Sequence, residues 1–260
     1  MKIISVMNIK GGVGKSLTAE LLARGFAEAG QKTLVVDADG QGDLTRTLLP
    51  EMEFDDDSSL SNRNLCAYLK GTSPLQNCIW HTSVENLDVL PSSLELFVVV
   101  YELNGKGGSD FMLYKGLHEL TGYDVVIIDN NPSVNKMTFN SIYAADMIIC
   151  PTNIGRKTLT GVTNTRKICL QAMDAFPLEK PMDFRILLTM MGRTRTSREG
   201  AEQLRTIYKD SVMKTEIRYQ VKPVQECELD GKSLLQDKRS GVAEDYRQFL
   251  REIMNKEVAV

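Results

Sequence analysis

A glycine-rich segment near the N-terminus constrains the fold of this chain more than any other feature. It reads Lys10-Gly-Gly-Val-Gly-Lys-Ser16, follows an apolar run of strand length at Lys2–Met7, and precedes the helix-like spacing of Ser16–Ala29. Glycines between a strand and a helix let successive backbone N–H groups point at phosphate oxygens, and the helix N-terminus adds its positive end. The segment therefore predicts a phosphate-binding loop made of Lys10, Gly11, Gly12, Val13, Gly14, Lys15, Ser16 and Leu17.

Two residues at the end of this loop carry side chains suited to a nucleoside triphosphate. We expect Lys15 to neutralise the β- and γ-phosphates and Ser16 to offer its hydroxyl to Mg²⁺. The sequence departs from the pattern G-x-x-x-x-G-K-[ST] at one place, where Ile9 stands for the first glycine. Because the strand, the helix and the Lys-Ser pair agree, the loop still predicts nucleotide binding.

Short apolar runs along the rest of the chain predict the fold class. They consist mostly of Val, Ile and Leu without alternation, as strands buried on both faces do. Helix-like segments separate the runs, which are Thr33–Val36, Asp124–Asp129, Met147–Cys150 and Phe184–Thr189. This order predicts an α/β fold, a doubly wound and mostly parallel sheet with helices on both faces, of the P-loop NTPase type.

The region from about Leu49 to Gly108 is less regular, and we interpret it as an insertion. It contains an acidic run at Glu51–Asp57 and possible short strands near Cys78–His81 and Leu87–Leu90. Helical spacing of apolar residues returns at Phe111–Leu120 and Val242–Asn255. Since no repeat or low-complexity tract divides the chain, we expect residues 1–260 to form a single domain.

Charge and cysteine content exclude several classes of protein. The chain has 31 Lys and Arg against 34 Asp and Glu, a net charge of −3, so any contact with DNA must use a local patch. Five scattered cysteines without a C-x-x-C pair argue against a disulfide framework or a zinc or cluster site, and predict free thiols. No signal peptide or membrane span is visible, and a cytoplasmic location is expected.

The loop's second lysine, at its start, makes it similar to the deviant Walker A motif, K-G-G-x-G-K-[ST], of the ParA/MinD family of ATPases. The resemblance implies that Lys10 reaches across a dimer interface to the nucleotide of the other subunit. Such a lysine resembles an arginine finger supplied in trans, which adds a cation to the transferring phosphoryl group when two subunits close. ATP and Mg²⁺ are the implied ligands.

A second match follows the second strand, where Asp37-Ala-Asp39-Gly-Gln-Gly-Asp43-Leu-Thr resembles the family's D-x-D-x-Q-G-N-x-T segment. The resemblance implies that Asp39 positions the attacking water and lies near the metal, in a switch that senses the γ-phosphate. Asp43 stands where the family usually has Asn and adds a carboxylate near the switch. An acidic turn that caps a helix at Leu44 is the alternative interpretation.

The third match is Val125–Asp129, an apolar strand that ends in a carboxylate and resembles the Walker B arrangement. It implies that Asp129 holds a Mg²⁺-bound water, so that Ser16, Asp39 and Asp129 surround the metal. Asn131 replaces the first proline of the family's D-x-P-P. Lys10, Lys15, Asp39 and Asp129 are thus the implied catalytic residues. Weaker matches, each of a few residues, lie at Leu87–Ser93, Cys150–Asn153 and Leu187–Met190.

An arginine cluster follows the last predicted strand and consists of Arg193, Arg195 and Arg198. On an acidic chain such a cluster is a candidate patch for phosphate contacts in non-specific DNA binding. The alternative is a solvated helix start whose arginines face water. The next candidates for DNA contact are Arg218, Lys222, Lys238 and Arg239.

The resemblance implies a ParA-type partition ATPase. In that family ATP closes a sandwich homodimer, the dimer binds DNA without sequence preference, and a ParB-like partner stimulates hydrolysis. The chain starts directly with a strand, as in the short form of the family, and a nucleoid-associated protein is expected. One alternative is a MinD-like membrane-cycling ATPase, although the final ten residues mix charges and favour no stable membrane association. Another is a nucleotide-switched scaffold with negligible turnover.

Overall fold

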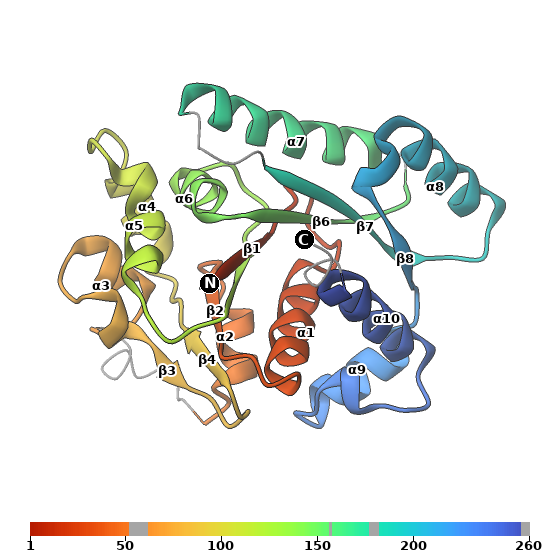
Figure 1. Cartoon of the computed structure of the whole chain (residues 1–260), viewed down its shortest axis with the longest axis horizontal. Helices are drawn as coiled ribbons and strands as arrows, with labels where there is room; N and C mark the ends of the chain where they lie inside the picture. The colour runs from red at the N-terminus through yellow and green to blue at the C-terminus, as the bar shows by residue number, and fades with distance from the viewer. Residues whose placement is uncertain (52–61, 156–157, 177–181, 256–260) are drawn as a thin grey trace.

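The computed structural model describes residues 1–51, 62–155, 158–176 and 182–255 (Figure 1). Across these residues one sheet of eight strands runs in the order β3-β4-β2-β5-β1-β6-β7-β8. All neighbouring strands pair in parallel except β3 and β4, which are antiparallel. The strands are β1 (Lys2–Val6), β2 (Thr33–Ala38), β3 (Trp80–His81), β4 (Leu87–Leu90), β5 (Val125–Asn130), β6 (Met147–Asn153), β7 (Asp183–Met191) and β8 (Val212–Arg218).

Helices cover both faces of the sheet, as the sequence predicts. The helices against one face are α1 (Lys15–Glu28), α2 (Asp43–Leu48), α9 (Val221–Leu229) and α10 (Gly241–Asn255). Those against the other are α3 (Leu65–Lys70), α4 (Leu96–Glu102), α5 (Met112–Glu119), α6 (Lys136–Ala144), α7 (Thr158–Ala175) and α8 (Arg195–Tyr208). In Figure 1, α1 and α10 lie below the central strands and α6 and α7 above them.

The central strands are buried on both faces because each alternates its apolar side chains between the two layers. In β5, Val125 and Ile127 pack with α1, whereas Val126 and Ile128 pack against the opposite layer. Continuous apolar strands are what such two-sided burial requires. The fold class predicted from the sequence is therefore confirmed. All five cysteines lie in the described residues and are free thiols, also as predicted.

The structure corrects two details of the predicted fold. Leu87–Leu90 is no insertion: β4 pairs in parallel with β2 and extends the main sheet. The sequence analysis also does not predict β8, in which only Val212, Met213 and Ile217 are buried, so that the strand has no continuous apolar run. Residues 52–57 of the acidic run lie outside the described residues. No helix in the described ranges is both long and apolar enough to cross a bilayer.

The carboxyl ends of the parallel strands meet at one edge of the sheet. The loop after β1 leads to α1 at this edge, and the ends of β2 and β5 lie on the same side of it. In open α/β sheets this edge is where ligands bind. The topology thus gathers there the three segments that carry the predicted chemistry.

Candidate functional site

The loop after β1 has the backbone shape that a phosphate cradle needs. Gly12 and Gly14 have φ of 66° and 83°, in the left-handed region that side chains disfavour, and α1 begins at the next residue. Thr189 at the end of β7 donates its hydroxyl to the carbonyl of Val13 over 2.9 Å. This bond ties the loop to the sheet. A polar residue at the end of an apolar strand is the only signal in the sequence for it.

Lys15 points back under the loop and is 7% exposed. Its Nζ lies 3.4 Å from the carbonyl oxygen of Lys10. Burial lowers the pKa of Lys15, while the negative charges of Asp129 and Asp39 oppose that shift. An ammonium held in a buried position under a glycine loop is a suitable partner for an anionic ligand.

Asp129 is the least satisfied charged group at this edge. It is 1% exposed, and its Oδ1 has no hydrogen-bond partner among the described residues. Burial, and next the charge of Asp37, raise the pKa of Asp129 well above its ordinary value, whereas Ser16 and Lys15 act in the opposite direction. Unpartnered buried oxygens are rare in proteins. A carboxylate oxygen beside a serine hydroxyl fits the oxygen ligands that Mg²⁺ prefers.

The two aspartates after β2 have different surroundings. Asp37 accepts hydrogen bonds from the backbone N–H and hydroxyl of Thr45, at 2.9 and 2.6 Å, and from the N–H of Asp39 at 3.1 Å. Burial raises the pKa of Asp37 to about 6. Because Thr45 lies in the first turn of α2, the capping interpretation applies to Asp37. Asp39 is half-buried and accepts from the N–H of Gln41 at 3.0 Å.

Lys10 lies against its own subunit. Its Nζ donates to Oδ1 of Asn153, at the end of β6, over 2.7 Å. Its backbone N–H donates to Asn8, whose amide in turn donates to the carbonyl of Pro151 over 2.8 Å. The sequence analysis assigned no role to Asn8, and it included Asn153 only in the weak match Cys150–Asn153. A polar residue directly after the apolar run Lys2–Met7 was the available signal for Asn8, which is 1% exposed.

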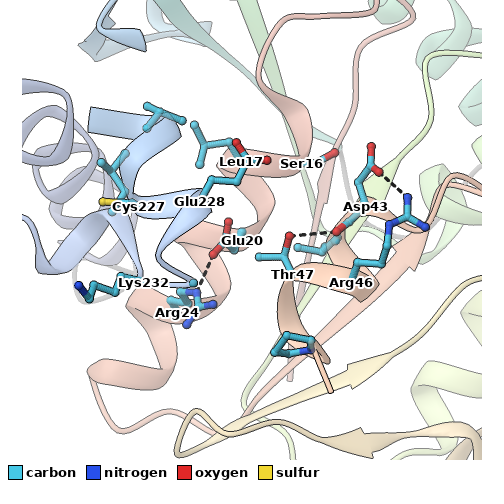
Figure 2. Close-up of a pocket in the computed structure, with 15 residues that line it drawn as sticks. Ser16, Leu17, Glu20, Arg24, Asp43, Arg46, Thr47, Cys227, Glu228 and Lys232 are labelled. Carbon is cyan, nitrogen blue, oxygen red and sulfur yellow. Dashed lines mark hydrogen bonds and ion pairs between the residues drawn. The ribbon is translucent and has the colours of Figure 1, made fainter. Parts of the chain in front are cut away.

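Asp43 and Asn131, the two residues that depart from the family pattern, both form hydrogen bonds with nearby residues. The Asp43 carboxylate accepts from Arg46 over 2.6 Å and so adds no free charge to the switch. Figure 2 shows this pair beside a cavity of about 560 Å³ between α1, α2 and α9, with Ser16 and Glu20 on its wall. Asn131 accepts from the N–H and hydroxyl of Ser133 over 3.1 and 2.7 Å. A hydrogen-bonded turn therefore stands where the family has proline.

The three arginines of the cluster lie in two different environments at the start of α8. Arg193 and Arg198 line an open groove of about 750 Å³ whose wall also includes Arg218. Arg195 is not part of that lining and pairs with Glu199 over 2.6 Å. Arg218 makes two bonds of 2.7 Å to Asp245, which neutralise its charge. Of the remaining basic candidates, Lys222 pairs with Glu226 at 3.5 Å, and Lys238 and Arg239 are exposed before α10.

Comparison with known proteins agrees with this geometry. A family model described as an AAA domain matches residues 1–176. The sporulation initiation inhibitor protein Soj of Bacillus subtilis is 31% identical over 260 residues, with 97% of this chain and 98% of that protein covered. The chromosome partitioning protein ParA of Myxococcus xanthus is also 31% identical, with 98% of this chain and 89% of that protein covered.

A solved structure supports the same fold. It is that of cobyrinic acid a,c-diamide synthase from Mycobacterium smegmatis with a bound ATP analogue and magnesium. It superposes with a TM-score of 0.82 at 24% sequence identity and covers 98% of this chain and 95% of that one. At this identity the similarity is one of fold.

Proposed function

Because the chain belongs to the family of AAA-domain ATPases that includes the chromosome-partitioning proteins Soj of Treponema pallidum and ParA, we propose that it hydrolyses ATP to drive DNA partition. The observation that supports hydrolysis most directly is the unpartnered Oδ1 of buried Asp129, close to Ser16 and to the ammonium of Lys15. The Lys15 ammonium needs an anion and the Asp129 carboxylate needs a cation, and Mg²⁺-bound ATP would provide both.

Each residue at the edge has a proposed role in this reaction. The backbone of Gly11–Leu17 and the ammonium of Lys15 bind the phosphates, and Ser16 and Asp129 hold Mg²⁺ with Asp39 near it. When bound, the metal neutralises charge on the β- and γ-phosphates. Asp39 is half-buried in the turn after β2, and we assign it the orientation of the attacking water.

We further propose that ATP brings two copies of the chain together as a homodimer. Lys10 would then leave Asn153, its hydrogen-bond partner within the subunit, and add its charge to the nucleotide of the partner subunit. This exchange makes completion of the site depend on dimerisation. Residues 1–260 act as one ATPase domain in this proposal.

The proposed macromolecular ligands are non-specific DNA on the nucleoid and a ParB-like protein that stimulates hydrolysis. DNA would contact Arg193 and Arg198 in their groove and the neighbouring Arg195. With a net charge of −3, the chain needs such a concentrated positive field to attract a polyanion. The proposal includes a cytoplasmic location without stable membrane association.

ATP turnover and DNA co-sedimentation, measured on one preparation with and without DNA, test this function. We expect turnover that requires Mg²⁺, and DNA that sediments with the protein only in ATP. Co-sedimentation with anionic vesicles in place of DNA would favour the membrane-cycling alternative. ATP-dependent dimers without measurable turnover would favour the scaffold.

A further inference from the structure

The ring of Phe97 in α4 lies directly on Gly40, the residue after Asp39. A Cβ built on residue 40 would lie 2.7 Å from Cε2 and 2.9 Å from Cδ2 of that ring. Carbon atoms in ordinary contact are at least about 3.5 Å apart. Gly40 has no left-handed φ, unlike Gly42 at 67°. A side chain at position 40 would therefore displace the Phe97 ring, whereas the backbone conformation there does not by itself favour glycine.

Helix α4 does not need Phe97 for its attachment to the protein. Leu96, Val99 and Val100 bury their side chains in the core on the side of β2 and β4. Phe97 itself is 45% exposed, so its ring covers the loop after β2 more than it fills the interior. A substitution at this position should leave the helix in place.

The covered loop has hydrogen bonds within itself and to two neighbouring elements. The N–H of Gln41 donates to the Asp39 carboxylate, and the N–H of Gly42 donates to the Asp39 carbonyl, each at 3.0 Å. The N–H of Asp39 donates to Asp37 on β2 over 3.1 Å, and the Arg46 side chain on α2 donates to the Gln41 carbonyl over 2.5 Å. These bonds hold the residues on both sides of Gly40, and the ring of Phe97 in α4 adds an apolar contact at Gly40 itself, next to Asp39.

We propose that Phe97 is a positioning residue for Asp39, acting through Gly40. The inference rests on the proposed role of Asp39 in hydrolysis and names the residue that holds the Asp39 turn in place. A shift of about 1 Å in a catalytic group can reduce the rate up to about 100-fold. Loss of the ring therefore affects the chemical step more than nucleotide binding, which depends on the loop after β1.

Kinetics of Phe97 variants test the proposal. We expect Phe97→Ala to lower kcat about tenfold with the KM for ATP unchanged, because positioning and not binding is impaired. Phe97→Tyr, which keeps the ring, should retain the native kcat. Tyr101→Ala is the matched control, since Tyr101 is an aromatic residue of the same helix that is 78% exposed.

A double-mutant cycle tests the contact itself. Gly40→Ala should lower kcat because the new methyl group displaces the ring, and the same change in a Phe97→Ala background should cost nothing further. Hydrogen exchange in the nucleotide-free protein gives a second readout. Phe97→Ala should speed exchange at the amides of Gln41 and Gly42 and leave that of Thr45, bound to Asp37, unchanged.

Asp39→Ala, assayed in parallel, separates the two possible failures. If Asp39→Ala loses turnover while Phe97→Ala keeps the native kcat and native exchange, the positioning role is wrong and the proposed function stands. The positioning role is also wrong if the losses of kcat caused by Gly40→Ala and by Phe97→Ala multiply when the two changes are combined. If Asp39→Ala turns over ATP normally, the proposed role of Asp39 is wrong, and the inference falls with it.

Discussion

Asp37 and Asp129 lie opposite each other on the adjacent parallel strands β2 and β5, yet only Asp37 has hydrogen-bond partners for both carboxylate oxygens. Thr45 and the N–H of Asp39 satisfy Asp37, so this residue shapes the turn that carries Asp39. Asp129 is equally buried, but its Oδ1 has no hydrogen-bond partner among the described residues. Of the two buried acids, Asp129 is therefore the one that needs a cation.

Replacement of Asp129 by Asn should separate stability from function. Because burial penalises the Asp129 charge, we expect Asp129→Asn to raise the free energy of unfolding of the nucleotide-free protein at pH 7.5. Mg²⁺ with ATP should raise the Tm of the native chain and not that of the variant. Chelation of Mg²⁺ should abolish this difference. Equal protection of both proteins would contradict the assignment.

Lys15→Ala should strongly weaken nucleotide binding. The ammonium is buried beneath the loop, and hydrogen bonds to charged groups contribute about 1.5–3 kcal/mol, so we expect the Kd for ATP to rise roughly 10- to 100-fold or more. Calorimetric titration measures this directly. Lys10→Ala is the comparison variant and should bind ATP as a monomer. Native affinity in Lys15→Ala would refute the phosphate-binding loop.

Asp39→Ala should bind ATP and still dimerise. Its hydrolysis rate should fall by a factor of roughly 100 or more, as for loss of a group that positions a nucleophile. Single-turnover kinetics with labelled ATP, together with gel filtration, distinguish the chemical step from assembly. A normal rate would move the water-orienting role to another residue, with Asp129 the next candidate.

Charge reversal in the groove beside α8 should weaken DNA binding without an effect on ATP binding. Each phosphate contact contributes about −0.9 to the slope of log K against log salt, so Arg193→Glu with Arg198→Glu should reduce that slope. Arg195→Glu should have a smaller effect because Arg195 already pairs with Glu199. Lys115→Glu on α5 serves as the control. An unchanged slope would direct attention to Lys222, Lys238 and Arg239.

Asp88 should stabilise the fold at the opposite edge of the sheet. Its buried carboxylate accepts from Tyr123 at 2.8 Å, contacts His81 at 2.7 Å and pairs with Lys32 at 2.8 Å. Burial alone would raise the pKa of Asp88, but these partners hold it below its ordinary value. We expect Asp88→Asn to cost about 2 kcal/mol at pH 7.

The pH dependence of that loss has a defined sign. A carboxyl group whose pKa is lower in the folded state stabilises the fold above its unfolded pKa of about 3.9 and loses this effect as the pH falls through its folded pKa. The difference between Asp88→Asn and the native chain should thus be complete at pH 7 and shrink below about pH 4. Urea unfolding at several pH values measures it, with His81→Ala as the control for a largely exposed partner.

The sequence by itself determined the fold class and the glycine loop. Both can be predicted from local sequence patterns. Burial on both faces requires continuous apolar runs in β1, β2 and β5. Lys10–Ser16 must bend between a strand and a helix, which requires glycines. The position of Asp129 followed in the same way, because a strand delivers the residues at its carboxyl end to that edge of the sheet. The sequence analysis did not predict β8, because one face of this strand is exposed and its apolar residues do not form a continuous run.

The tertiary structure decided which of the charged residues are free to act. Lys10 meets Asn153 across 143 residues of sequence, Arg218 meets Asp245, and Gly40 meets Phe97. These contacts depend on strand order and helix placement, which join residues that no local pattern links. These tertiary contacts therefore give Asp37 a structural role and leave Oδ1 of Asp129 without a hydrogen-bond partner in the described part of the chain, although both residues end an apolar run in the sequence.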